Sequence, residues 1–273
     1  MAIYQGAAKR LDSIDIPRIA STIDCGEDEL RAFMEVEAGG RGFDSQGRVK
    51  ALFEPHKFYA NLSGAKRDLA VKRGLAYPKW GQKKYPKDSY PRILSAMAID
   101  ETAALKSISW GLGQIMGENY GMLGYDSPQA MVAAFAADEE HHLEGIVQFL
   151  VKSGIDDDLR AHRWAVVARV YNGPGYVKNK YDVNLEKAYK KWAKIPDVVW
   201  TTTATPKPVV VMLGRNSKGV YVKRVQTALG IRIDGDYGAK TEGAVKKFQL
   251  LHKLAPDGKV GPKTWEVLIG NAA

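Results

Sequence analysis

Two glutamates, Glu35 and Glu37, are the first residues whose type and spacing could do chemistry. They lie in the stretch "LRAFMEVEAGGRGF". Leu30, Phe33 and Met34 recur at helical spacing, and Glu37 continues their apolar stripe at i+7, whereas Glu35 does not. A carboxylate on an apolar helix face is desolvated, which raises its pKa and suits it to donate a proton near neutral pH. The alternative for Glu37 is a helix-end residue that faces solvent or caps a backbone group. Glu35 is expected to be a solvated surface residue.

Two later segments could bind an extended ligand. "SISWGLGQIMGENYG" surrounds Ser109 and Gln114 with glycines, and "ARVYNGPGY" places Tyr171 and Asn172 before a glycine turn. Small residues let a polymer approach the backbone. The Gln, Asn and Tyr side chains offer hydrogen bonds and an apolar ring face of the kind that binds sugars. Each signal alone is weak.

The cysteine and the paired histidines do not predict a metal or redox site. Cys25 is the single cysteine, so an internal disulfide is excluded, and no partner histidine lies near it in the sequence. His141 and His142 match no zinc-binding spacing and are expected on a helix surface. We therefore predict no metal and no cofactor.

These residues need helices to position them, and the N-terminal part is mostly helical by pattern. Asp24 is a candidate N-cap for a helix that ends at Gly39. Ser127 to Gly154 predicts one long helix, capped by Ser127 and closed by Gly154. A further helix is predicted to end near Tyr171. Strand signals are few and short, so the predicted fold class is mainly α.

A linker divides the chain. "TTTATPKP", residues 201–208, combines a threonine run with two prolines, which is typical of an extended connection. The predicted domains are therefore residues 1–200 and residues 209–273.

The smaller domain contains an internal repeat. "DGDYGAKTEGAV" starts at Asp234 and "DGKVGPKTWEVL" starts at Asp257, and five of the twelve positions are identical. Each copy predicts an Asp-Gly turn followed by a helix that is N-capped by a threonine, Thr241 or Thr264. With "GVYVKRVQTALG" as the first helix, the pattern predicts a three-helix module. Such a module without a catalytic constellation is expected to be a binding module.

The charge distribution favours an anionic partner. The formal net charge is +9 over 273 residues, and residues 209–273 hold 11 Lys/Arg against 5 Asp/Glu. The rest is near charge balance, so nucleic acid is not expected as a partner. No apolar run reaches the roughly 18 residues of a membrane span, and the N-terminus has no signal-peptide pattern. The chain is therefore expected to be made and folded in the cytoplasm, without stable membrane insertion.

Taken in order, "VEAGG", "SWGLGQIM" and "ARVYNGPG" resemble the lysozyme-like superfamily of goose-type lysozymes and lytic transglycosylases. "EVEAGGRGFDSQGRVKALFEPHKFY" resembles more closely the phage endolysin N-acetylmuramidase family, over about residues 24–192. The C-terminal repeat resembles the peptidoglycan-binding domain with a "DGxxGxxT" signature, over about residues 214–268.

The resemblance implies a lysozyme-like helical catalytic domain plus a small three-helix peptidoglycan-binding domain. It implies Glu37 as the general acid, although Ala38 stands where the family has serine, which affects the hydrogen bonds around the acid. It also implies two sets of contact residues. The substrate-contact positions are Ser109, Gln114, Tyr171 and Asn172, and those of the wall-binding module are Asp234, Gly235, Thr241, Asp257, Gly258 and Thr264.

The second catalytic carboxylate stays open. An inverting glycosidase needs a base roughly 6.5–9.5 Å from the acid, and a retaining one needs a nucleophile roughly 5–5.5 Å away. Glu54 is the first candidate, with a structural pairing to His56 or to a nearby arginine as the alternative, and Glu101 and Asp44 are weaker. A lytic transglycosylase needs no second carboxylate, as the resemblance implies.

The sequence thus predicts a modular endolysin that hydrolyses the β-1,4 bond between N-acetylmuramic acid and N-acetylglucosamine in peptidoglycan. The alternatives are a lytic transglycosylase and a non-catalytic wall-binding protein. We expect a monomer that stays in the host cytoplasm until a holin-type partner releases it to the cell wall.

Overall fold

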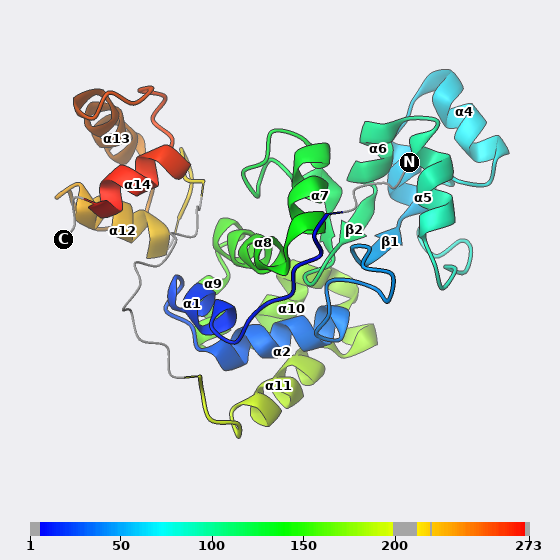
Figure 1. The fold of residues 1–273 in the computed structure, drawn as a ribbon, viewed down its shortest axis with the longest axis horizontal. Helices are drawn as coiled ribbons and strands as arrows, with labels where there is room; N and C mark the ends of the chain where they lie inside the picture. The colour runs from blue at the N-terminus through cyan, green and yellow to red at the C-terminus, as the bar shows by residue number, and fades with distance from the viewer. Residues whose placement is uncertain (1–5, 199–211, 219, 271–273) are drawn as a thin grey trace. The chain divides into compact units, whose positions relative to one another are not determined.

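The computed structural model describes residues 6–198, 212–218 and 220–270 (Figure 1). Helices dominate these residues, and one small sheet accompanies them, in agreement with the predicted mainly-α class. The elements up to the end of the sheet are α1 (Asp15–Ser21), α2 (Glu27–Ala38), β1 (Ala51–Phe53), α3 (Pro55–Asn61), α4 (Gly64–Lys72), α5 (Tyr90–Met97), α6 (Glu101–Lys106), β2 (Ile108–Trp110) and β3 (Ile115–Met116). The later elements are the 3-10 helix η1 (Gly117–Asn119), α7 (Pro128–Ala137), α8 (Glu139–Lys152), α9 (Asp156–Arg160), α10 (Trp164–Asn172), the 3-10 helix η2 (Pro174–Asn179), α11 (Tyr181–Trp192), α12 (Val220–Ala228), α13 (Ala239–Leu251) and α14 (Pro262–Gly270).

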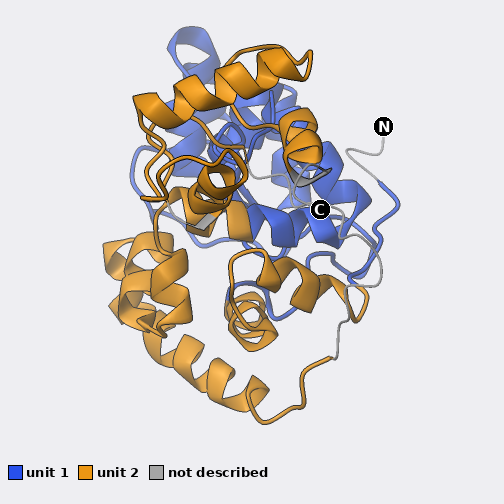
Figure 2. Cartoon of the chain, turned by 90° about the vertical axis from the view of Figure 1, so that its left-hand side faces the viewer, with its two compact units in different colours: residues 1–11, 37–146 blue, residues 12–36, 147–273 orange. Residues whose placement is uncertain are grey.

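The chain divides into two compact units, which Figure 2 colours separately. Unit 1 comprises residues 1–11 and 37–146, and unit 2 comprises residues 12–36 and 147–273. The predicted linker, residues 201–208, lies outside the described residues. The predicted boundaries of the two domains therefore stay predictions.

The core of unit 1 is built on a three-stranded antiparallel sheet in the order β1-β2-β3. Leu52 pairs with Ser109, and Ser109 pairs with Met116, so one serine lies at the centre of the sheet. Phe53 and Trp110 are almost fully buried, and α5 and α6 pack nearby. Burying such large side chains supplies most of the driving force for the unit.

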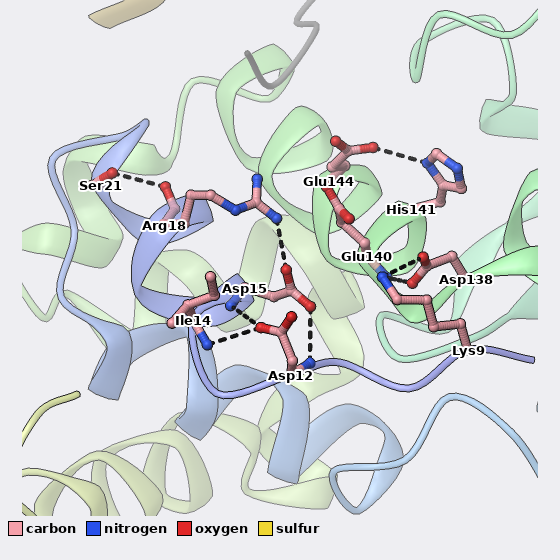
Figure 3. Close-up of polar contacts among 10 residues, drawn as sticks. All are labelled: Lys9, Asp12, Ile14, Asp15, Arg18, Ser21, Asp138, Glu140, His141 and Glu144. Atoms are coloured by element: carbon pink, nitrogen blue, oxygen red, sulfur yellow. Dashed lines mark hydrogen bonds and ion pairs between the residues drawn. The ribbon is translucent and has the colours of Figure 1, made fainter. Parts of the chain in front are cut away.

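The predicted long helix from Ser127 to Gly154 is in fact two helices, α7 and α8, separated by an extended Asp138. The N-terminal segment causes the break, because the backbone N–H of Lys9 donates to Ala137 and the N–H of Glu139 donates to Lys9. The Asp138 carboxylate also receives the Lys9 ammonium and the N–H of Glu140 (Figure 3). The predicted cap at the other end is confirmed, because the Ser127 side chain accepts from the N–H of Ala130.

Helix α2 begins three residues later than its predicted cap. Asp24 has a positive φ of 52° and closes α1 instead, with its N–H donating to Ser21 and the N–H of Cys25 donating to Ala20. This is the usual left-handed closure of a helix C-terminus. At the start of α1, the Asp12 carboxylate accepts from the N–H groups of Ile14 and Asp15 (Figure 3). The predicted end of α2 is correct to one residue.

The C-terminal module consists of the three predicted helices, α12, α13 and α14. The predicted threonine N-caps are wrong, because α13 begins two residues before Thr241 and α14 begins two residues before Thr264. Both threonines instead lie within the first turn, where their hydroxyls accept hydrogen bonds from two buried glutamines, Gln226 and Gln249.

A search of the described residues for a helix both long enough and apolar enough to cross a membrane finds none.

Candidate active site

Glu37 lies in the last turn of α2, and its predicted position at the end of an apolar stripe is correct. Leu30, Phe33 and Met34 are buried, while Glu37 is half-buried. The helix ends at Ala38 because the two following glycines have positive φ angles of 61° and 71°. Glu37 is therefore preceded by the buried apolar face of α2 and followed by the end of the helix.

A pocket of about 500 Å³ lies at this helix end. Glu37 and Ala38 line it together with residues from the following loop, from the start of α5 and from the turn between β2 and β3. These further lining residues are Asp44, Ser45, Arg48, Lys50, Ala51, Lys87, Asp88, Ser89, Tyr90 and Gln114.

Lys50 joins three segments around the pocket. Its ammonium donates to the Ala38 carbonyl at the end of α2 at 2.5 Å, and its N–H donates to the Gly42 carbonyl at 2.7 Å. Its carbonyl accepts from the N–H of Gly111 at 2.8 Å. Partial burial, with the charges of Arg41 and Arg10 nearby, lowers the pKa of the Lys50 ammonium. Lys50 thus fixes the helix end that carries Glu37, and sequence reasoning gave no signal for this role.

His142 packs against two of the segments that Lys50 joins, those of Gly42 and Gly111. Its Nδ1 accepts from the N–H of Leu112 at 3.3 Å, and its Nε2 donates to the Phe135 carbonyl at 2.7 Å. Because a carbonyl can only accept, the imidazole is neutral with its hydrogen on Nε2. A Cβ added at Gly42 or Gly111 would clash with this ring, so both positions require glycine. Burial lowers the pKa of His142 to about 4.

The expectation of a surface histidine pair is thus wrong for His142, which is fully buried. It holds for His141, which is partly exposed and pairs with Glu144 (Figure 3). No group of three or more candidate metal ligands occurs within the described residues. Cys25 is buried, and desolvation together with Glu29 raises the pKa of its thiol, which argues against a nucleophilic role.

Asp44 shares the pocket with Glu37. Its carboxylate accepts from the Arg48 guanidinium at 2.7 Å and from the N–H groups of Gln46 and Arg48 at 2.8 and 3.0 Å. Partial burial opposes its ionisation, but these hydrogen bonds outweigh burial and lower the pKa of Asp44. The Arg48 guanidinium also lies over the Tyr90 ring at 4.1 Å, which fixes its orientation. Asp44 is therefore a firmly ionised carboxylate in the Glu37 pocket.

Glu54, the first sequence candidate for the second carboxylate, is not among the residues that line this pocket. It accepts from the Tyr85 hydroxyl at 2.5 Å and lies 3.3 Å from Nδ1 of His56. The structural pairing with His56, which the sequence left as an alternative, is thus present. Glu101 does not line the pocket either, because it begins α6.

Of the predicted contact residues in unit 1, Gln114 lines the pocket and Ser109 does not. Gln114 takes a left-handed φ of 45°, and its amide donates to the Gly111 carbonyl at 2.9 Å. Ser109 is 7% exposed, and its hydroxyl is 3.4 Å from the Gln114 side-chain oxygen. Ser109 therefore supports Gln114 more directly than it faces a ligand.

Tyr171 and Asn172 end α10 in unit 2 and are not among the residues that line the Glu37 pocket. The Tyr171 ring packs edge-on against Phe33 and Phe149, with centroid distances of 4.5 and 4.7 Å. Glu35 also has a defined role in unit 2. Its side chain is partly exposed, and its carboxylate accepts from Lys191 and from the Trp192 indole.

The predicted wall-binding residues form two copies of one network, each centred on a buried glutamine, with Asp234 and Asp257 exposed at its edge. In the second copy the Gln249 amide donates to Asp257, to the Lys259 carbonyl and to Thr264, while its oxygen accepts from the N–H of Gly258. In the first copy Gln226 makes the matching bonds to Asp234, the Asp236 carbonyl, Thr241 and Gly235. The repeat signature therefore organises the turns of the module.

Two family profiles match separate parts of the chain. The sequence profile of the N-acetylmuramidase family matches residues 27–193, and that of a peptidoglycan binding domain matches residues 219–268. Among solved structures, the crystal structure of Burkholderia AP3 phage endolysin is similar, with a TM-score of 0.61 and 36% sequence identity. That similarity covers 68% of this chain and 73% of the endolysin chain.

Two curated proteins match shorter segments. An uncharacterized protein of the bpoA1 3′ region of Kitasatospora aureofaciens is 44% identical over 64 residues, 21% of this chain and 54% of that protein. A probable N-acetylmuramoyl-L-alanine amidase of Bacillus licheniformis is 46% identical over 59 residues, 17% of each protein. The chain thus spans about half or less of the length of these relatives.

The N-acetylmuramidase profile covers more than half of the chain and includes Glu37, Asp44 and Gln114, the residues that the pocket brings together. The chain therefore belongs to the N-acetylmuramidase family.

Proposed function

We propose that this chain is a modular phage endolysin. In this proposal it hydrolyses the β-1,4 bond between N-acetylmuramic acid and N-acetylglucosamine in bacterial peptidoglycan. The observation that carries the proposal is the composition of the Glu37 pocket in a member of the N-acetylmuramidase family. The half-buried Glu37, in the last turn of an apolar helix, shares this pocket with Gln114 and with Asp44, whose pKa is lowered. The similarity to a solved phage endolysin supports the same function.

Glu37 is the proposed general acid, which protonates the oxygen of the leaving sugar. Asp44 is a better-supported second carboxylate than Glu54, because it lines the same pocket and its pKa is lowered. A base or nucleophile must be ionised while the acid is protonated, and carboxyl groups in different environments divide these roles. Gln114 is proposed to bind the substrate at the pocket.

The C-terminal module is proposed to hold the enzyme on peptidoglycan, which raises the local concentration of the catalytic residues at the wall. The proposed enzyme is a monomer without a metal or other cofactor, and nucleic acid is not a proposed partner. It remains in the host cytoplasm until lysis, when a holin-type partner gives it access to the periplasm and cell wall.

Mass spectrometry of the fragments released from purified peptidoglycan tests this function. Hydrolysis produces reducing N-acetylmuramic ends. Release of 1,6-anhydromuramic ends would instead assign the chain as a lytic transglycosylase, the alternative that the resemblance leaves open.

The Glu37→Gln variant tests the role of the acid. Loss of a general acid is expected to lower the rate by about 10²–10⁴-fold, while wall binding in a pull-down is retained. An unchanged lysis rate would remove Glu37 from the mechanism and favour a non-catalytic wall-binding protein.

A further inference from the structure

The end of α4 and the segment that connects it to α5 (Figure 1) carry a concentration of positive charge. Residues 69–87 contain six Lys/Arg and no Asp or Glu. All six side chains are exposed, and among the described residues none of them has an ion pair. They are Lys72, Arg73, Lys79, Lys83, Lys84 and Lys87. We call residues 72–87 the cationic loop.

Neighbouring cations in the same unit are neutralised. Lys57 pairs with Glu118 at 2.8 Å, and Lys66 pairs with Asp100 at 2.7 Å. The cationic loop therefore differs from an ordinary charged surface, on which both signs alternate. Uncompensated like charges repel one another, and this arrangement produces a positive potential that a polyanion can neutralise.

The loop is anchored at both ends. Tyr77 is buried, and the Tyr85 hydroxyl donates to the Glu54 carboxylate at 2.5 Å. The Ser89 hydroxyl, just beyond the loop, accepts from the N–H of Phe53 in β1 at 3.3 Å. Glu54 thus holds the loop to the strand end, and the exposed cations project from a positioned backbone. Trp80 is 66% exposed in the middle of the loop and offers an apolar ring face.

The loop borders two hollows. Lys87 lines the Glu37 pocket, and Lys72, Tyr77 and Lys83 line a second hollow of about 610 Å³. Tyr59 and Arg67, from α3 and α4, also line this second hollow, as does Asp68. A ligand that extends from the Glu37 pocket along the loop would therefore meet several cations and aromatic rings, with Asp88 and Asp68 as neighbouring acidic side chains.

We propose that the cationic loop binds the peptide-stem carboxylates of the peptidoglycan strand whose sugars occupy the Glu37 pocket. The inference rests on the proposed function. The sugar rings are uncharged and need no cations, whereas peptide stems that are not cross-linked end in free carboxylates. Continuity of the loop with the catalytic pocket through Lys87 favours the substrate over a separate polyanion, such as an anionic lipid surface.

The test compares two forms of one substrate with the full-length chain. Intact peptidoglycan is used beside peptidoglycan whose carboxylates have been converted to amides with carbodiimide and ammonia. The variant Lys79→Glu/Lys83→Glu/Lys84→Glu reverses three cations of the loop. A matched control, Lys178→Glu/Lys187→Glu/Lys194→Glu, makes the same charge change at exposed lysines near and on α11.

For the unaltered chain, the half-saturating concentration of intact substrate is expected to be about fivefold lower than that of amidated substrate, because several exposed ion pairs each contribute a few tenths of a kcal/mol. The loop variant is expected to lose this difference at unchanged kcat, whereas the control keeps it. High salt is expected to reduce the difference, because these pairs are screened.

Three results would overturn the inference: equal half-saturation for both substrates, an equal loss in the loop variant and the control, or a loop variant that loses only its binding to vesicles containing phosphatidylglycerol. The last result would assign the loop to anionic lipid. Failure of the proposed function is distinguishable, because the unaltered chain would then release no muramic ends from either substrate.

Discussion

At the residue scale, the two candidates for the second carboxylate have different surroundings. Asp44 accepts three hydrogen bonds from Arg48 and Gln46 within the pocket, and its pKa is lowered. Glu54 has its carboxylate committed to Tyr85 and close to His56, outside that pocket. Asp44 thus lines the pocket beside Glu37, whereas Glu54 anchors the segment that carries Tyr85.

The variants Asp44→Asn and Glu54→Gln separate these roles. Asp44→Asn is expected to lower kcat by about 10²-fold or more, because a base or nucleophile is lost. Glu54→Gln can still accept from Tyr85 and is expected to keep kcat within about twofold of the unaltered chain. Muropeptide release measured beside thermal unfolding checks both, and the reverse pattern would return the assignment to Glu54.

His142 predicts a stability that depends on pH. Its pKa is lowered to about 4 from the ordinary 6.5, so the fold favours the neutral ring. Its contribution is fully present above pH 6.5 and is lost as the pH falls through 4, by about 3 kcal/mol in total. The free energy of unfolding can be measured with urea at a series of pH values. Between pH 6.5 and 4, it is expected to fall less steeply with decreasing pH in His142→Gln than in the unaltered chain.

His141→Gln is the matched control for this measurement. The hydrogen bond with Glu144 raises the pKa of His141, so its contribution is present below pH 6.5 and is lost as the pH rises above its folded pKa. The control should therefore change the pH dependence of the unfolding free energy above pH 6.5, where His141 makes the unaltered chain less stable as the pH rises. A His142→Gln variant with the slope of the unaltered chain would contradict a buried, neutral His142.

At the element scale, the sequence predicted those features that depend on adjacent residues. The Ser127 cap and the end of α2 at the glycine pair both follow from local rules. A feature that depends on a distant segment was missed, because Lys9 breaks the helix at Asp138. Asp24 was misassigned between two adjacent helices, since it closes α1 rather than opening α2. The candidate site divides in the same way. Periodicity located Glu37, but sequence spacing could not decide which later carboxylate lines its pocket, because that depends on how the loops fold back.

The buried glutamines of the C-terminal module carry the prediction at this scale. Gln249→Leu leaves the buried N–H of Gly258 and the buried hydroxyl of Thr264 without the glutamine partner, whereas the exposed Asp257 keeps the N–H of Lys259. Unsatisfied buried polar groups each cost about 1–3 kcal/mol, so the module should be clearly destabilised. Hydrogen exchange at Gly258 is expected to accelerate more than exchange at Gly235 in the first copy.

Gln226→Leu is the reciprocal control and should reverse this order of exchange. Molecules that stay folded should bind the wall as before, because the substituted glutamines are themselves buried. Weaker binding without faster exchange would indicate instead that the repeat signature contacts the wall directly.

At the scale of the whole molecule, the net charge of +9 conceals two basic concentrations of +6 each. One is the C-terminal 65 residues, and the other is residues 69–87 in the family-defining part. The rest of the chain is therefore slightly acidic. Its negative charge offsets half of the charge of the cationic loop, so the net charge of the N-terminal part gave no sign of the loop. Both basic segments suit an anionic polymer. In the proposed function, the C-terminal module holds the enzyme on the wall, and the cationic loop binds the strand that occupies the Glu37 pocket.

A chain that ends at Val198 tests how the two parts of the molecule divide the work. The N–H of Val198 donates to Glu27 at 2.8 Å, so the cut keeps this contact and removes those of Lys152 with Ser217 and of Asp24 with Arg224. The truncated chain is expected to cleave soluble glycan fragments at an unchanged kcat, because every residue of the Glu37 pocket remains. On insoluble peptidoglycan its half-saturating concentration should rise by about tenfold or more, because the loss of a second binding module removes the gain in effective concentration. Turnover of both substrates by the two chains measures this directly. Equal half-saturation on insoluble wall would show that the module does not hold the enzyme there, whereas a fall in kcat on soluble fragments would show that the module takes part in the reaction itself.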